Sequence, residues 1–212
     1  MMESCVERPR HPPNQMFLRM CDSAGAKSTA EPDRTYGSRC PCIRLRLATA
    51  QMNDQPNTAF LVRAATPADA GQIARLFFDT VHHVNSQDYA PHQIEAWAPM
   101  VRPVADWAER QSTRRTWVAV LHAEIIGFGE LEASGHIDCF YSHKDYQGVG
   151  VGTALLAAIV AEAIRLGVPR LSAEVSITAR PFFERRGFCV VREMQTEVRG
   201  VTLVNYLMER HI

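Results

Sequence analysis

The segment Gln147-Gly148-Val149-Gly150-Val151-Gly152 restricts the possible folds of this chain more than any other. It follows an apolar stretch that ends near Ser142, and it leads directly into a run of helical spacing that extends to Leu166. Glycines let a backbone turn tightly and bring its amides close to a ligand. The start of the helix adds unpaired N–H groups and the positive end of the helix dipole. Such a turn is suited to binding a pyrophosphate.

Three classes of protein use a glycine turn in this way, and the residues distinguish them. A P-loop ends in Gly-Lys-Ser/Thr, whereas Gly152 is followed by Thr153 and Ala154. A dinucleotide-binding G-x-G-x-x-G from Gly148 would need glycine at position 153, and it would follow the first strand of a βαβ unit. The pattern Gln/Arg-x-x-Gly-x-Gly/Ala is matched fully by Gln147, Gly150 and Gly152. The remaining alternative is a turn that only caps a helix.

Hydrophobic periodicity predicts one domain over residues 58–212. Thr66-Pro67-Ala68-Asp69 is a strong helix start, with threonine at the cap and proline at the first position. The expected order is β-α-α-β-β-β-α-β-α-β-β, which indicates an α+β or α/β domain around a mixed sheet. Expected strands cover 59–65, 117–121, 125–131, 136–142, 170–175, 188–196 and 202–208, and expected helices cover 66–84, 91–111 (broken near Pro99 and Pro103), 148–166 and 179–185.

Residues 1–57 lack this periodicity and mix Pro, Arg, Ser, Gln and Cys. We expect a disordered or spurious leader there, because such a stretch cannot bury enough apolar surface to offset its chain entropy. Met52 is a plausible natural start, which the intact mass of the natural protein would test. Cys40 and Cys42 have no second pair at zinc spacing, so no metal site is expected.

The overall composition predicts a cytoplasmic protein without a nucleic-acid or membrane partner. The 212 residues carry 23 Lys plus Arg and 23 Asp plus Glu, so no charge excess favours a nucleic acid or an anionic membrane. No apolar run approaches the roughly 20 residues that span a bilayer. Cys139 and Cys189 lie in apolar strand-like contexts, where buried reduced thiols are expected.

The segments flanking the glycine turn resemble the GNAT superfamily of acyl-CoA N-acyltransferases. The segment 140–148, FYSHKDYQG, is similar to the family's strand-to-loop signature, with Lys144 where proline is common. The segment 179–188, ARPFFERRGF, is similar to its late helix. DTVHHVNSQDYAPHQIEAWAP and GFGELEASGHID resemble a bacterial subgroup of uncharacterised acetyltransferases. The resemblance implies the GNAT fold, a mixed and mostly antiparallel twisted sheet flanked by helices.

The resemblance also implies where acetyl-CoA, the expected co-substrate, would bind. Its pyrophosphate would lie on the amides of Gln147, Gly148, Val149, Gly150, Val151, Gly152 and Thr153. Its pantetheine arm would pair like an extra strand with the backbone of Phe140 and Ser142, next to Tyr141, at a splayed sheet edge.

Attack on the thioester requires a neutral amine, and therefore a base. His136 falls near a catalytic position of some relatives, and strand alternation is expected to place it on one face with Asp138, Phe140 and Ser142. Glu130 is the second candidate base and Asp138 the third. The family's usual acid, a late-helix tyrosine, is replaced by Phe183, so Tyr141, a water or unassisted departure of the thiolate remain open.

The acceptor pocket is expected from the first two helices, where His82, Asn85, Tyr89 and Trp97 cluster. An aromatic, histidine-rich lining suits a small amine or an amino-acid-like acceptor. We therefore expect direct transfer of an acetyl group from acetyl-CoA to a primary amine, without a metal. A non-catalytic acyl-CoA sensor is the alternative function, and a homodimer through the last strands is possible by analogy with the family.

Overall fold

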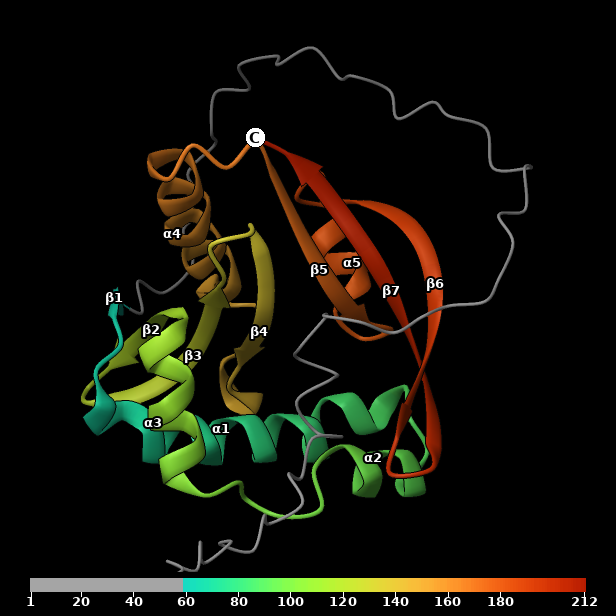
Figure 1. The fold of residues 1–212 in the computed structure, drawn as a ribbon. Helices are drawn as coiled ribbons and strands as arrows, with labels where there is room; N and C mark the ends of the chain where they lie inside the picture. Colours follow the sequence, from blue (N-terminus) through green and yellow to red (C-terminus); the bar gives the residue numbers. More distant parts are fainter. Residues whose placement is uncertain (1–58) are drawn as a thin grey trace, which may run out of the picture.

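The fold is built on a seven-stranded sheet with the order β1-β2-β3-β4-β5-β7-β6 (Figure 1). The computed structural model describes residues 59–212. The predictions for the leader, for Met52 as a start and for Cys40 and Cys42 concern residues outside this range. Among the strand pairs within residues 59–212, only β4–β5 is parallel, so the expected mixed, mostly antiparallel sheet is confirmed.

The element order follows the sequence prediction, except that the stretch 91–111 forms two separate helices. The strands are β1 (Leu61–Ala64), β2 (Arg115–Leu121), β3 (Glu124–Leu131), β4 (His136–Ser142), β5 (Arg170–Ser176), β6 (Cys189–Val198) and β7 (Val201–His211). The helices are α1 (Ala70–His83), α2 (Pro91–Trp97), α3 (Val104–Thr113), α4 (Val151–Arg165) and α5 (Arg180–Glu184), with 3-10 turns at Pro67–Asp69, Asn85–Gln87 and Lys144–Tyr146.

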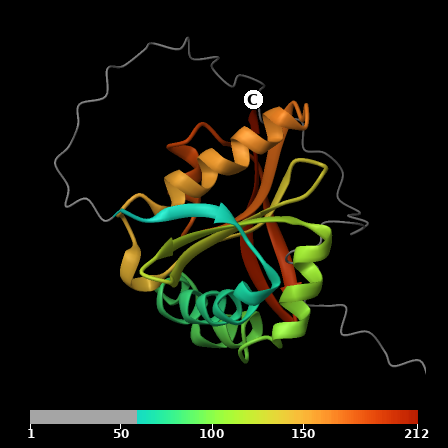
Figure 2. The same cartoon turned by 90° about the vertical axis from the view of Figure 1, so that its left-hand side faces the viewer.

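Helices cover both faces of the sheet. Figure 2 shows α4 on one face and α1, α2 and α3 on the other. Gly127 on β3 lets α4 approach closely, because a Cβ at this residue would lie 2.5 Å from Cγ1 of Val151. The hairpin between β2 and β3 turns at His122 and Ala123, as predicted, and both residues have positive φ angles of 48° and 69°.

The sheet divides between β4 and β5. These strands pair only at His136 with Ser172 and at Ile137 with Ala173, after which they separate. Beyond this point, β4 has an edge without a strand partner, as the sequence comparison with the family implied. Figure 1 shows β4 and β5 diverging from this junction.

A β-bulge in β4 overturns the expected alternation of its side chains. Gly129 pairs with Phe140 but Leu131 pairs with Ile137, so Asp138 and Cys139 together oppose Glu130. Cys139 consequently packs with α1 and α3, whereas Phe140 packs on the α4 side. The prediction that His136, Asp138, Phe140 and Ser142 share one face was therefore wrong.

The two cysteines within the described residues differ in environment. Cys139 is buried, as expected. Cys189 is exposed at the start of the edge strand β6, so the prediction of a buried thiol there was wrong. Apolar neighbours in the sequence did not imply burial because β6 lies at the sheet edge, where most of its residues face solvent.

Candidate active site

A cavity of about 460 Å³ opens where β4 and β5 separate. The glycine turn, the start of α4 and α5 contribute to its lining. Residues from β4, β5, β7, α2 and the end of α1 complete the lining. The cavity therefore joins the predicted coenzyme loop to the predicted acceptor region.

The glycine turn has the backbone geometry of an anion site. Gly148 and Gly150 have positive φ angles of 77° and 95°, which favour glycine. Helix α4 begins at Val151, and its first backbone bond within the helix runs from the N–H of Ala154 to the carbonyl of Gly150, 3.1 Å away. The amides of Val151, Gly152 and Thr153 thus have no partner within the helix, and these residues line the cavity.

Gln147, the first residue of the motif, connects the glycine turn to the end of β4 through its side chain. Its Nε2 donates to the carbonyl oxygens of Ser142 at 2.7 Å and His143 at 3.1 Å. The hydroxyl of Thr80 also donates to the Ser142 carbonyl, at 3.1 Å. This carbonyl already accepts two hydrogen bonds, so a pantetheine arm would have to use other backbone groups of β4.

Aromatic rings form the wall beside the turn. Phe140 lies 5.4 Å from the ring centroids of both Phe182 and Phe183. A Cβ at Gly152 would approach the Phe182 ring to 2.9 Å, so in this chain the ring packs directly against the backbone of the last motif glycine. Phe183 lines the cavity and is buried, so the phenyl group that replaces the family's tyrosine brings no hydroxyl to the site.

Arg186 adds positive charge next to the glycine turn. Its guanidinium donates to the hydroxyl of Thr153 and to the carbonyl of Phe182, and it lies 3.7 Å from the centroid of the Phe182 ring. Burial lowers its pKa from the ordinary value. A guanidinium beside the first turn of α4 can pair with phosphate oxygens held by that turn.

Polar side chains gather on the acceptor side. Leu171, Ala173 and Val175 of β5 pack toward α4, so the alternating residues Glu174 and Ser176 face α1 and α2. Asn205 of β7 donates through Nδ2 to Oε2 of Glu174 at 3.4 Å. Asn85 donates to the hydroxyl of Ser176, also at 3.4 Å. All four of these polar residues line the cavity.

The four residues predicted for the acceptor pocket divide into two pairs. Asn85 and Trp97 line the cavity. His82 and Tyr89 are not among its lining residues; His82 contacts the carbonyl of Ala98 through Nε2 at 2.7 Å. The hydroxyl of Tyr89 donates to Val204 at 2.6 Å and accepts from the amide of Ile177 at 3.0 Å. Burial raises the pKa of Tyr89 to about 12, consistent with a neutral structural bridge.

Only some of the residues predicted to transfer protons line the cavity. Tyr141 and Asp138 line the cavity, whereas His136 and Glu130 are absent from its lining. His136 is buried at the closed end of the β4–β5 junction, where its Nδ1 lies 3.2 Å from the hydroxyl of Ser172. His136 or Glu130 could therefore act on a substrate only through a bridging water or after a movement of the site.

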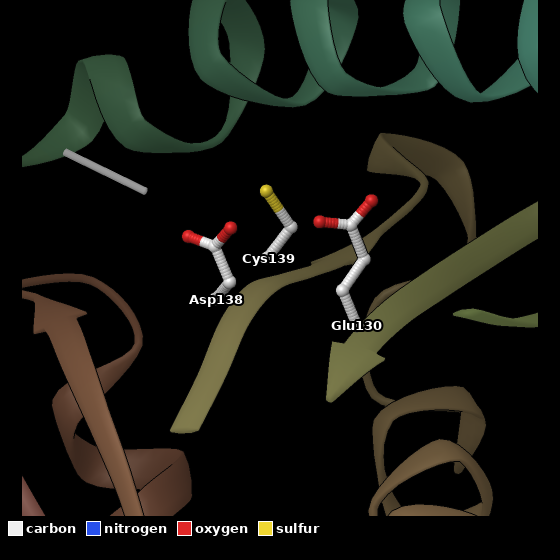
Figure 3. Close-up of side chains that lie close together, drawn as sticks. All are labelled: Glu130, Asp138 and Cys139. Atoms are coloured by element: carbon white, nitrogen blue, oxygen red, sulfur yellow. The ribbon is translucent and has the colours of Figure 1, made fainter. Parts of the chain in front are cut away.

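Glu130 belongs to a buried ionic cluster with α3. Nη2 of Arg110 lies 2.6 Å from both Glu130 Oε2 and Asp138 Oδ2, and Arg114 Nε lies 2.7 Å from the same Asp138 oxygen. Figure 3 shows that Glu130, Asp138 and Cys139 point in one direction, as the bulge requires. Their ligand atoms lie within 4.8 Å of one another, but the Arg110 guanidinium occupies the space beside them. A metal ion there would have to displace a salt-bridged cation.

Comparison with known families identifies the fold. The family described as the acetyltransferase (GNAT) domain matches residues 85–210, more than half of the chain. The chain belongs to the GNAT family of N-acetyltransferases. Its GNAT domain has the acyltransferase activity that defines this enzyme family.

One related protein sequence and one related crystal structure support the same assignment. The chain is 34% identical over 147 residues to the uncharacterised N-acetyltransferase YafP of Escherichia coli K12, covering 69% of this chain and 93% of YafP. It is 32% identical to a GCN5-related N-acetyltransferase of Rhodopseudomonas palustris, with a TM-score of 0.69 and coverage of 72% and 96% of the two chains.

A more distant structure shares the fold. The PaiA N-acetyltransferase of Thermoplasma acidophilum, solved in complex with coenzyme A, has a TM-score of 0.60 at 16% identity and covers 73% of this chain and 99% of its own. No helix within residues 59–212 of the GNAT domain is long and apolar enough to cross a membrane.

Several polar residues that line the cavity of this GNAT domain were not predicted from the sequence, among them Glu174, Arg186 and Asn205. A signal for Glu174 was present, because it is the charged residue on the polar face of an alternating strand. Arg186 and Asn205 had no comparable signal. Their positions depend on how α5 approaches α4 and on the insertion of β7 beside β5.

Proposed function

We propose that this protein transfers an acetyl group from acetyl-CoA to a primary amine by direct attack of the amine on the thioester. The observation that carries the proposal is the glycine turn at the start of α4, which opens into a cavity between separated strands. PaiA of T. acidophilum, which has the same fold, was solved with coenzyme A.

The coenzyme would occupy the α4 side of the cavity. Its pyrophosphate would accept hydrogen bonds from the amides around Gly150 and Gly152, with Arg186 supplying positive charge. Its pantetheine arm would run along the unpaired edge of β4, past Phe140. The thioester would then face the side of the cavity that carries Asn85 and Trp97.

The reaction needs one proton removed from the acceptor ammonium and one returned to the departing thiolate. Tyr141 lines the cavity and is our proposed proton donor to the thiolate. His136 remains our proposed base, acting through water from the closed end of the junction. In His136→Gln, the pH profile of kcat/KM should lose its acidic limb, whereas an unchanged profile would reject His136 as the base.

Calorimetric titration of the full-length protein with acetyl-CoA tests the binding step, and release of free thiol in the presence of an amine panel tests transfer. We expect Gly150→Ala to weaken acetyl-CoA binding by about tenfold, because the positive φ is strained in alanine and the turn would shift. Gly167→Ala is the matched control. Gly167 has a φ of 69° and open space around it, but it lies at the opposite end of α4.

Gly150→Ala and Gly167→Ala should lower the stability of the protein by similar amounts, and only Gly150→Ala should weaken the binding of acetyl-CoA. Equal affinities in both variants would contradict the assignment of the turn as the coenzyme site. Binding without thiol release on any amine would contradict the proposed transfer.

A further inference from the structure

A single guanidinium nitrogen contacts both strands at the bulge in β4. Nη2 of Arg110 lies 2.6 Å from Oε2 of Glu130 on β3. The same nitrogen lies 2.6 Å from Oδ2 of Asp138 and 3.4 Å from Sγ of Cys139, both on β4. These are the residues that oppose one another at the bulge. Because their side chains project to the same side of the sheet (Figure 3), one cation from α3 reaches all of them.

Helix α3 holds this cation against the sheet. The Arg110 side chain is 4% exposed, and its guanidinium carbon lies 5.3 Å from the centroid of the Trp107 ring on the same helix. Arg114, one turn later, places its Nε 2.7 Å from the same Asp138 oxygen. Two guanidinium groups of one helix therefore converge on the bulge.

The carboxylates of Glu130 and Asp138 would repel each other without Arg110. Their oxygens lie within 4.8 Å of one another, and neither side chain is exposed to solvent. Like charges at this separation repel strongly in a medium of low polarity. The cation removes this repulsion between β3 and β4, and it fixes the side of the strand to which Asp138 turns. Arg110 therefore determines the geometry of the bulge as well as the attachment of α3.

The bulge lies where β4 becomes a free edge. Pairing with β5 ends at Ile137, and the next two residues, Asp138 and Cys139, form the bulge. Residues 140–142 follow it and line the cavity. A bulge redirects the strand that contains it. The shape of this bulge thus sets where the backbone groups of residues 140–142 lie, and a pantetheine arm would pair with groups on this edge.

We propose that Arg110 is a positioning residue for the coenzyme, which holds the β4 bulge in the shape that the pantetheine arm requires. This inference rests on the proposed function and concerns the arm alone. Helix α4, whose first turn would bind the pyrophosphate, covers the face of the sheet opposite α3 (Figure 2). Loss of Arg110 should therefore weaken the contacts of the arm and leave those of the pyrophosphate.

Two ligands separate these contributions. Acetyl-CoA contains the pantetheine arm, whereas 3′-phospho-ADP has the same nucleotide and pyrophosphate without the arm. Calorimetric titration of the full-length protein gives the Kd of each, and the ratio of the 3′-phospho-ADP value to the acetyl-CoA value measures what the arm contributes. In Arg110→Gln, which removes the cation, we expect this ratio to fall by at least about tenfold, while the Kd of 3′-phospho-ADP changes by less than about threefold.

Two further variants separate position from stability. In Arg110→Lys, a shorter side chain keeps one charged nitrogen but loses the planar group near Trp107, so the ratio should lie between those of wild type and Arg110→Gln. Leu203→Ala is the control, because Leu203 is fully buried in β7 and is not a lining residue. It should lower stability by leaving a cavity in the core, and the ratio should stay at the wild-type value.

Hydrogen exchange without ligand provides a second readout. Exchange at residues 138–142 should be faster in Arg110→Lys than in wild type, and Leu203→Ala should not show this local change. Equal exchange at these residues in the two variants would overturn the inference.

The titrations distinguish this inference from the proposed function. Acetyl-CoA binding by wild type with an unchanged ratio in Arg110→Gln would overturn the role of Arg110 and leave the proposed function standing. Failure of wild type to bind acetyl-CoA would contradict the proposed function, and the role of Arg110 toward the coenzyme with it.

Discussion

The buried cluster around Arg110 shows how single side chains determine the shape of the site. Arg110 and Glu130 are almost completely buried, and their ion pair links α3 to β3 at 2.6 Å. The same guanidinium holds Asp138, which the β4 bulge turns toward α3. Removing a buried cation leaves its partner carboxylate charged and unpaired in a medium of low polarity, and this lowers the stability of the folded protein.

We therefore expect Arg110→Ala to lower the free energy of unfolding by about 3 kcal/mol or more. Arg170→Ala, which removes a partly exposed ion pair with Glu209, should change the free energy of unfolding by no more than about 1 kcal/mol. Urea unfolding of the two variants measures both values. Similar small losses would show that the Arg110 cluster contributes little to stability.

Phe183 occupies the position where the family commonly has a tyrosine, and it lines the cavity. We expect Phe183→Tyr to change kcat by less than about tenfold, because a simple thiol has a pKa near 8.5 and its thiolate departs with little help from an acid. Steady-state thiol release with a fixed amine measures the change. A larger increase would mean that protonation of the thiolate limits the wild-type reaction.

Among single residues, the sequence predicted those whose role depends on local backbone geometry. Gly148 and Gly150 have the positive φ angles expected of the turn, and Gly152 makes the close approach. Residues whose role depends on contacts between distant segments were not predictable in this way. Strand β2 lies between Arg110 and Glu130 in the sequence, and no local sequence pattern indicated that these two residues form an ion pair.

At the level of elements, the 3-10 turn at Pro67–Asp69, which leads into α1, illustrates a local signal that was confirmed. Thr66 and Asp69 form a capping box, and Asp69 also binds Arg63 through both carboxylate oxygens, at 2.7 Å and 2.8 Å. The Arg63 hydrogen bond, followed by those from Thr66, lowers the pKa of Asp69 from 3.8 to about 2, against the opposing effect of burial.

Because the folded-state pKa is the lower one, this stabilisation is complete above about pH 5 and is lost as the pH falls from about 4 toward 2. Asp69→Asn should lower the free energy of unfolding at pH 7 by about 1–2 kcal/mol and reduce the loss of stability between pH 4 and pH 2. Thermal unfolding across this pH range provides the measurement. An unchanged acid profile in the variant would contradict the role of Asp69.

The packing of α4 on β3 connects stability to the coenzyme site. A methyl group at Gly127 would meet Val151, the first residue of α4, so Gly127→Ala should weaken acetyl-CoA binding as well as lower stability. Gly71→Ala in α1 is the matched substitution, since its nearest new contact is an ordinary 3.9 Å to Val104. It should leave affinity unchanged and stabilise the protein by up to about 1 kcal/mol. Loss of stability without loss of affinity in Gly127→Ala would argue that α4 can shift independently of the turn.

At the level of the whole molecule, the sheet consists of two parts that meet over only two residue pairs. Strands β1 to β4 form one part, and β5, β7 and β6 form the other. A coenzyme in the cavity would contact both parts and add interactions across the junction. A ligand at 100 times its Kd stabilises the folded state by about 2.7 kcal/mol.

Hydrogen exchange should therefore slow on addition of acetyl-CoA at residues 138–142 of β4 and at the start of α4. Exchange in the edge strand β6 should not change, because β6 lies on the far side of β7 and contributes no residue to the cavity lining. Mass spectrometry of exchange with and without acetyl-CoA measures both regions. Uniform slowing over the whole sheet would indicate general stabilisation without a local contact.

The bulge in β4 also restricts how the length of this chain can vary. Because two residues of β4 oppose one of β3 at this point, deleting Asp138 or Cys139 would remove the bulge and leave Phe140 opposite Gly129 on its present face. Either deletion would, however, remove one of the two β4 side chains that contact Arg110. The preceding turn at residues 132–135 carries no such requirement, so length variation among homologous sequences should accumulate in the turn and be absent from the strand.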